Sequence, residues 1–253
     1  MGGNVTAPRT STACPYDEYG GIDVLHSLVR PRTEVPAETS FIVATQVMEL
    51  LFGLLRHEWE QAQTALRADD LTEALAALRR GTKVQDVLVS SWDLLSTMTP
   101  AEFGAFRDAL GTASGVQSRA YRRLEFLLGN KSAGMARMHP ELAEALQQPS
   151  LYDDVLALLE RRGLLTRPAE SPEIEKAWLL VYTSPEHQDL AALAEVLLDT
   201  AERVTRWRQR HLSSVRRAMG AKPGTGGSSG LSWLRVAAEQ DVFPELWSVR
   251  NDL

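Results

Sequence analysis

The sequence contains little cysteine, no excess of positive charge and no long apolar run, and each shortage excludes a class of protein. Its single cysteine, Cys14, excludes an internal disulfide framework and a cysteine-rich zinc site, and it favours a reducing cytoplasm. The formal net charge of −6 argues against a general nucleic-acid-binding surface. Because there is no run of about 18 consecutive apolar residues, no membrane span is expected.

The composition of the 253 residues is typical of a soluble globular protein. Apolar residues make up 44% and charged residues 24%, so a core of useful size can form. Residues 1–15 are dominated by Gly, Thr, Ser and Pro and lack the apolar centre of a signal peptide, so we expect them to be disordered. Residues 16–253 are then expected to form a single domain.

The chain also lacks the turn signals of β-hairpins, whereas apolar residues recur every three or four positions. This spacing predicts a helix beginning at Pro100 and others over residues 37–68, 71–97, 116–128, 140–146, 152–162, 174–182 and 190–219. The expected fold class is all-α, a bundle of long antiparallel helices.

The first two predicted helices each present an apolar face. On the first helix, this face is apolar except for Thr45 and consists of Phe41, Thr45, Met48, Phe52 and Leu55. On the second helix, the residues expected on the buried side are Leu75, Leu78, Val84, Val87, Leu88 and Leu94.

Residues 206–230 combine a basic helix with a loop of small residues. The helix contains His211, and a neutral imidazole on a rigid helix is a common metal or haem ligand, although most single histidines on helices bind nothing. The loop that follows, KPGTGGSSG, lets the backbone approach a ligand closely and contains Thr225. It does not fit a phosphate-binding loop, because Lys222 precedes the glycines and no strand comes before them.

Five segments together resemble the tryptophan 2,3-dioxygenase superfamily. They are FGAFRDALGTASGVQSRAYRRLEFLLGNK, RWRQRH with KPGTGGSSG, FIVATQVMELLFGLLRHEW, YDEYGGIDVL and FPELWSVR. The resemblance implies an all-α haem b enzyme, usually a homotetramer built as a dimer of dimers, that uses O₂ as co-substrate. Its implied partner is a small aromatic amino acid, and no nucleic acid or membrane partner is implied.

The resemblance also implies roles for single residues at the iron and at the substrate head group. His211 matches the proximal ligand of haem iron, and this ligation leaves the opposite face of the iron open. Arg107 matches the residue that binds the substrate carboxylate, which suits its planar guanidinium. A charge on the apolar stripe of Phe103 and Leu110 needs such a partner. Thr225 matches the threonine of a loop that closes on the amino and carboxylate groups.

Further matches concern the walls of the pocket. Ser114 matches a serine near the distal haem face, and Phe41 and Phe103 match aromatic walls. Tyr16 and Tyr19 match residues of an N-terminal arm that, in the family, packs against the pocket of a neighbouring subunit.

One position departs from the family pattern. The dioxygenases have a distal histidine four residues after the position of Phe41, and here that position is Thr45. None of the other histidines replaces it by spacing: His57 lies 12 residues along the same helix, or about 18 Å away. Thr45 can still accept one hydrogen bond from an indole N–H, but it is smaller than histidine and leaves room beside the substrate.

This departure leaves three hypotheses open, of which the first, placed in specialised metabolism, is the main prediction and the other two are alternatives. The first is a haem-dependent oxygenase that adds one oxygen atom to tryptophan or a methylated tryptophan, giving a 2-oxindole. The second is a tryptophan 2,3-dioxygenase that gives N-formylkynurenine and tolerates threonine. The third is a non-catalytic haem- or indole-binding protein. In each case we expect a cytoplasmic homo-oligomer.

Overall fold

The computed structural model describes residues 14–227 and 229–253, and every regular element within these ranges is a helix. The all-α prediction is therefore confirmed for the described residues. The expectation of a disordered N-terminus falls on residues 1–15, most of which lie outside this described part.

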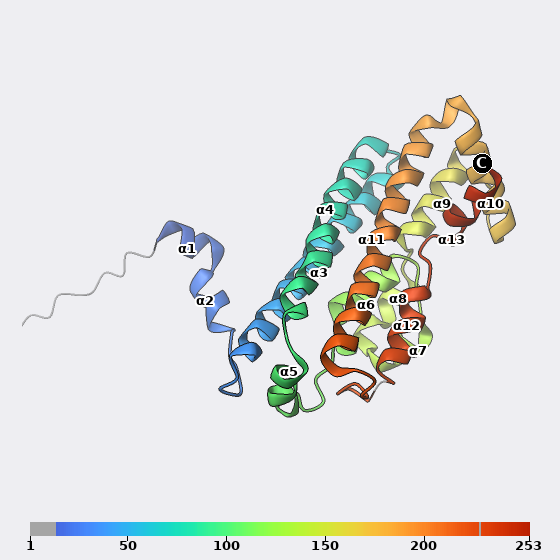
Figure 1. Ribbon diagram of the computed structural model, residues 1–253. Coiled ribbons are helices and arrows are strands. Elements are labelled where there is room, and N and C mark those ends of the chain that lie inside the picture. The colour runs from blue at the N-terminus through green and yellow to red at the C-terminus, as the bar shows by residue number, and fades with distance from the viewer. Residues whose placement is uncertain (1–13, 228) are drawn as a thin grey trace, which may run out of the picture.

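Three long helices form the body of the molecule: α3 (Pro36–Arg67), α4 (Leu71–Ser96) and α11 (Gln188–Met219). Helices α3 and α4 lie side by side as an antiparallel pair, and α11 packs along α4 (Figure 1). The turn between α3 and α4 is tight because Asp69 adopts a left-handed conformation and the Asp70 side chain caps α4 by accepting a hydrogen bond from the Glu73 backbone N–H. The predicted bounds of these three helices agree with the structure to within about two residues.

A continuous apolar core lies between the long helices. On α3 it includes Met48, Phe52, Leu55 and Trp59. By length and composition alone, helix α3 could span a membrane. This is weak evidence for a membrane span, because the core helices of soluble proteins can be equally long and apolar. The α3 residues in this core pack against α4 and α9 (Leu151–Arg161).

The buried face predicted for α4 was partly wrong. Leu78, Val84 and Leu88 are buried as expected, but Val87 is 49% exposed and Leu94 is 52% exposed. The buried face of α4 includes Leu78, Leu88 and Trp92. Successive residues of a helix are rotated by about 100°, so Val87, next to Leu88 in sequence, points away from this face. Val87 and Leu94 therefore form a separate, exposed apolar stripe.

Shorter helices close one end of the bundle. They are α5 (Pro100–Phe106), η1 (Arg107–Leu110), η2 (Gly115–Gln117), α6 (Arg119–Leu127) and α12 (Leu231–Glu239). The helix predicted from Pro100 changes to a tighter 3₁₀ turn at Arg107, and α6 begins after Ser118, whose hydroxyl oxygen accepts a hydrogen bond from the Tyr121 N–H. These breaks place residues 111–118 across the end of the bundle as a connecting segment.

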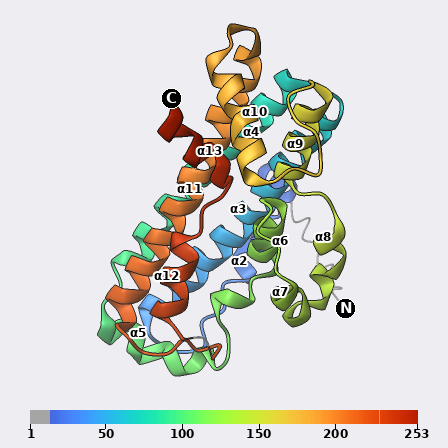
Figure 2. The same ribbon diagram turned by 90° about the vertical axis from the view of Figure 1, so that its right-hand side faces the viewer.

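The remaining helices lie at the other end and along the sides of the bundle (Figure 2). They are α7 (Ala133–Met138), η3 (Pro140–Leu142), α8 (Ala143–Gln147), α9, α10 (Ser171–Thr183), η4 (Pro185–His187), α13 (Pro244–Ser248) and η5 (Val249–Asp252).

Two short helices form an N-terminal arm that extends away from the bundle (Figure 1). They are α1 (Pro15–Gly20) and α2 (Ile22–Ser27), and no residue of either helix is buried. Tyr16 is 73% exposed and Tyr19 is 97% exposed. Neither tyrosine therefore contributes to a pocket within its own chain.

Candidate active site

A cavity of about 470 Å³ lies at the end of the bundle closed by the short helices. Its walls come from α3, α4, α5, η1, α6, α11 and α12, from the connection 111–118, and from Gly224, Thr225 and Gly230 of the glycine-rich loop. Most of the lining side chains are apolar or aromatic, among them Phe41, Met48, Leu95, Phe103 and Trp233. This size and this composition are typical of a site for a cofactor and a small aromatic ligand.

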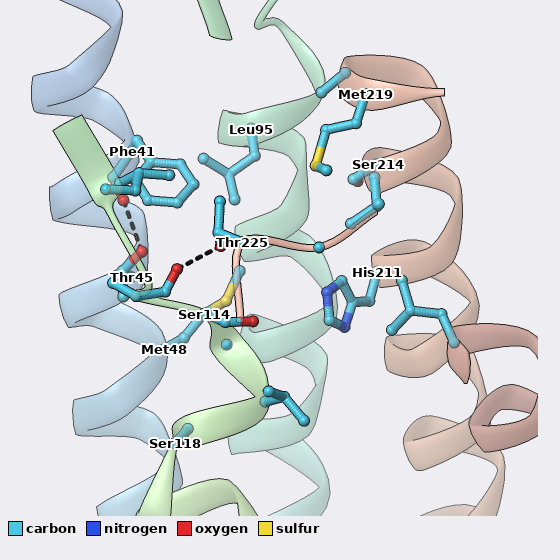
Figure 3. Close-up of a pocket in the computed structure, with 18 of the residues that line it drawn as sticks. Phe41, Thr45, Met48, Leu95, Ser114, Ser118, His211, Ser214, Met219 and Thr225 are labelled. Carbon is cyan, nitrogen blue, oxygen red and sulfur yellow. Dashed lines mark hydrogen bonds between the residues drawn. The ribbon is translucent and has the colours of Figure 1, made fainter. Parts of the chain in front are cut away.

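His211 projects from α11 into the cavity (Figure 3). Burial, and to a smaller extent the positive charge of Arg122, lower the pKa of His211 to about 4, so the imidazole is neutral near pH 7. Among the described residues, no hydrogen bond is made to either ring nitrogen. His211 therefore offers a neutral nitrogen lone pair to an occupant of the cavity.

A group of aromatic rings holds the His211 imidazole in place. The ring of Trp92 stacks on it with a centroid distance of 4.6 Å and an angle of 16°. Trp207, one turn earlier on α11, meets the imidazole edge-on at 5.5 Å and stacks on Tyr121 at 4.9 Å. We did not predict Trp92, Trp207 or Tyr121 as site residues. Trp207 could have been predicted, because it lies four residues before His211 on the same helix and so on the same face.

The glycine-rich loop packs against the 111–118 segment. The Thr225 hydroxyl donates a hydrogen bond to the Ala113 carbonyl oxygen at 2.5 Å, which Figure 3 marks with a dashed line. Beside it, a Cβ atom added to Gly226 would lie 2.7 Å from the Ser114 Cβ, so only glycine fits there without movement. The loop therefore forms a close-fitting wall over Ser114.

Arg107 lies next to this loop. Its NH2 group donates a hydrogen bond to the Pro223 carbonyl oxygen at 2.8 Å, which ties η1 to the start of the loop. Its Nε atom is buried and has no hydrogen-bond partner among the described residues. One donor of the guanidinium thus has no partner in the part of the chain that the structure describes, and Arg107 is not among the residues that line the cavity.

Thr45 occupies the cavity wall on α3 (Figure 3). Its hydroxyl donates a hydrogen bond to the Phe41 carbonyl oxygen at 2.8 Å, one helical turn earlier. The lone pairs of the hydroxyl oxygen remain free to accept a hydrogen bond. The Phe41 ring packs against Phe103 with a centroid distance of 6.0 Å and a tilt of 51°.

The structure brings most of the predicted site residues to one cavity. The ones that line it are Phe41, Thr45, Phe103, Ser114, His211 and Thr225. Arg107 borders the cavity without lining it, and the arm residues Tyr16 and Tyr19 lie away from it. The proximity of the first group agrees with a shared site, and the individual roles stay predictions.

The family model described as "Tryptophan 2,3-dioxygenase" matches residues 3–180 and 140–253. The chain belongs to the tryptophan 2,3-dioxygenase family. It is 41% identical to the tryptophan 2,3-dioxygenase of Polaromonas sp., over 94% of this chain and 87% of the relative. It is 42% identical to the enzyme of that name from Bradyrhizobium sp., over 94% of this chain and 92% of the relative. It is 40% identical to the tryptophan 2,3-dioxygenase of Caulobacter vibrioides, over 94% of this chain and 98% of the relative.

Family membership confirms a haem-dependent oxidoreductase with haem b as cofactor and O₂ as co-substrate. The residues present fit this group, because the neutral His211 lacks a hydrogen-bond partner among the described residues and faces a largely apolar cavity. A flat, mostly apolar macrocycle is compatible with such walls, and His211 is the residue that would hold its iron.

Proposed function

We propose that the protein oxygenates the indole ring of L-tryptophan, adding both atoms of O₂ to give N-formylkynurenine. The observation that carries this proposal is the cavity itself, in which the unpartnered imidazole of His211 lies opposite aromatic walls and beside the seated loop of Thr225. The names of relatives that match over 94% of the chain support the same activity.

The chain's own residues would bind and orient the substrate. Haem, when bound through His211, supplies an iron that activates O₂. The unpaired Nε donor of Arg107 and the hydroxyl of Thr225 would bind the carboxylate and amino groups of tryptophan. Thr225 can keep its hydrogen bond to Ala113 and still accept one from the substrate amino group, so the loop would stay packed on Ser114 when substrate binds. The indole ring would then pack against Phe41 and Phe103.

A second candidate activity is mono-oxygenation of L-tryptophan or a methylated tryptophan to a 2-oxindole. Thr45 favours it, because this position lacks the imidazole that would hold the indole N–H from one side. The Thr45 hydroxyl donates to its own helix backbone, so it would contact the indole as an acceptor only. The smaller side chain leaves space for an added methyl group, and a small misplacement near a reacting centre redirects or slows a step by orders of magnitude.

Mass analysis of products formed under ¹⁸O₂ distinguishes the two activities. L-tryptophan and β-methyl-tryptophan would be turned over separately by the wild type. N-formylkynurenine with two labelled atoms supports dioxygenation, and a 2-oxindole with one labelled atom supports the second candidate. In the latter case, Thr45→His should shift the product towards ring cleavage, whereas Ser40→His, on the same helix but outside the cavity wall, should not.

We also propose that the N-terminal arm crosses to a neighbouring chain in a cytoplasmic homo-oligomer. The exposure of Tyr16 and Tyr19 supports this, because aromatic side chains rarely stand free on an arm without a core. A second exposed apolar surface formed by Leu50, Leu54, Val87 and Leu94 is available for the same assembly. Light scattering should report a dimer or tetramer. A fully active monomer at micromolar concentration would contradict the proposal.

A further inference from the structure

Arg122 on α6 is a buried cation without a carboxylate partner among the described residues. The residue is 5% exposed, and its guanidinium carbon lies 5.2 Å from the ring centroid of Tyr121 and 5.0 Å from that of Trp233. Its one hydrogen bond among the described residues is from Nε to the Val116 carbonyl oxygen at 3.3 Å. A buried charge normally requires an ion of opposite charge, and aromatic faces replace only part of that interaction.

The nearby carboxylate is already occupied. Arg208 on α11 is equally buried, and its NH2 group binds both carboxylate oxygens of Glu125 at 2.9 Å. Asn130 donates a further hydrogen bond to Glu125. The cluster therefore contains two buried guanidinium groups and one carboxylate, which is paired with Arg208, so it holds one positive charge in excess.

The pKa values of the two arginines reflect this difference. Burial lowers the pKa of Arg122, and the attraction of Tyr121 and Glu125 does not offset it. Burial also opposes the charged form of Arg208, but the adjacent Glu125 outweighs it and the pKa of Arg208 is raised. The charge of Arg122 is thus the one that its surroundings leave uncompensated.

The uncompensated charge lies directly behind the cavity wall. The three residues that contact the Arg122 guanidinium, namely Val116, Tyr121 and Trp233, all line the cavity. An anionic group on an occupant of the cavity would therefore be attracted by Arg122, although the acidic residue Glu49 also lines the cavity.

We propose that Arg122 binds a carboxylate carried by the occupant of the cavity, namely a propionate of haem b. Arg122 does not itself line the cavity, but its NH1 and NH2 groups make no hydrogen bond among the described residues. A carboxylate that reached them would compensate the excess charge of the cluster. The inference rests on haem binding at His211. The carboxylate of the amino-acid substrate has the same chemistry, so the experiment must separate these two sources.

The first arm compares haem b with haem dimethyl ester, in which the propionates carry no charge. Equilibrium binding to haem-free protein would be followed by the absorbance of the Soret band for the wild type, Arg122→Leu and Arg123→Leu. Arg123 is exposed on the same helix and serves as the matched control. We expect the wild type and the control to prefer haem b by about 30-fold, and Arg122→Leu to lose most of this preference.

The second arm measures binding of L-tryptophan and of tryptamine, which lacks the carboxylate, to the haem-loaded proteins. If Arg122→Leu keeps the preference for haem b but loses the preference for L-tryptophan, Arg122 binds the substrate carboxylate and not a propionate. If neither preference changes, Arg122 binds no carboxylate and the proposal is wrong.

Two further results keep the proposal testable. A wild type that binds haem b and its dimethyl ester equally well overturns the propionate contact while leaving haem binding at His211 intact, and a wild type that binds neither overturns both. Should Arg122→Leu fail to fold by circular dichroism, Arg122→Lys retains the charge without the bidentate geometry. It should keep only part of the preference for haem b, and an unchanged preference would count against the proposed contact.

Discussion

Substitution of Gly226 by alanine tests whether the fit of the glycine-rich loop on Ser114 positions the substrate. The added Cβ would lie 2.7 Å from the Ser114 Cβ and 3.1 Å from the Ser114 Oγ. Carbon atoms at optimal separation are about 3.5–4.0 Å apart, so one side must move by about 1 Å. The Ser114 Cβ is attached to the backbone and cannot rotate away, so we expect the loop with Thr225 to move outward.

The expected loss follows from this displacement. A misplacement of about 1 Å in a substrate-positioning group costs on the order of 100-fold in rate, so kcat/KM for L-tryptophan should fall by about that factor in Gly226→Ala. Steady-state kinetics would measure it, with thermal denaturation as a check on folding. Gly104→Ala is the control, because its added Cβ meets no atom within 4 Å and its position is outside the cavity wall.

A second substitution identifies the clash as the cause. Ser114→Gly removes the two atoms that the new Cβ would meet, so Gly226→Ala should cost much less in that background than in the wild type. If Gly226→Ala lowers kcat/KM by the same factor in both backgrounds, steric displacement from Ser114 is not the reason. If it leaves kcat/KM unchanged, the loop does not position the substrate.

Three further predictions concern the iron, the head group and the acid stability. His211→Ala should lose bound haem and the Soret band of a histidine-ligated protein, and a wild type that stays colourless after reconstitution would exclude haem. Arg107→Leu should raise the Kd for L-tryptophan by about tenfold or more but leave that for indole unchanged, as measured by spectral titration; an equal Kd in both proteins would remove its carboxylate role. Hydrogen bonds from the Thr33 hydroxyl and from the Arg32 and Thr33 N–H groups lower the pKa of Glu38, so its stabilising effect is present above its unfolded pKa of about 4.5 and is lost as the pH falls through the folded value. Glu38→Gln should therefore lower the melting temperature near pH 7 and have little effect near pH 3, and an equal loss at both would contradict this assignment.

The sequence predicted those parts of the molecule that depend on neighbours along the chain. The bounds of α3 and α4 follow from apolar periodicity, and His211 and Thr225 could be found because each lies in a contiguous motif. The six-residue helices α1 and α2 were not predicted, since they are too short for an apolar period to appear. The exposure of Val87 shows a different limit, because a helix with apolar residues on two faces does not reveal which face is buried.

Contacts between distant segments could not be read from the sequence. Trp92 and His211 lie on different helices, and their stacking depends on how α4 and α11 pack. The uncompensated charge of Arg122 depends on the position of Glu125 relative to Arg208, and a sequence alone does not show which of two arginines a carboxylate binds. Both features became visible only when the helices were placed in space.

The polar groups of the cavity support a further prediction, that Thr45 affects the product. The hydroxyls of Thr45 and Thr225 both donate hydrogen bonds to backbone carbonyl oxygens, of Phe41 and Ala113 respectively. Neither hydroxyl oxygen is thereby prevented from accepting a hydrogen bond, but an indole ring in this cavity would be held mainly by its contacts with Phe41 and Phe103. A ring that is held mainly by van der Waals contacts changes position when a side chain of the cavity wall changes in size. We therefore expect substitutions of Thr45 by Ser, Val and His to change the ratio of one-oxygen to two-oxygen products more than the affinity for L-tryptophan. A series in which affinity changes and the ratio stays constant would show that Thr45 affects binding alone.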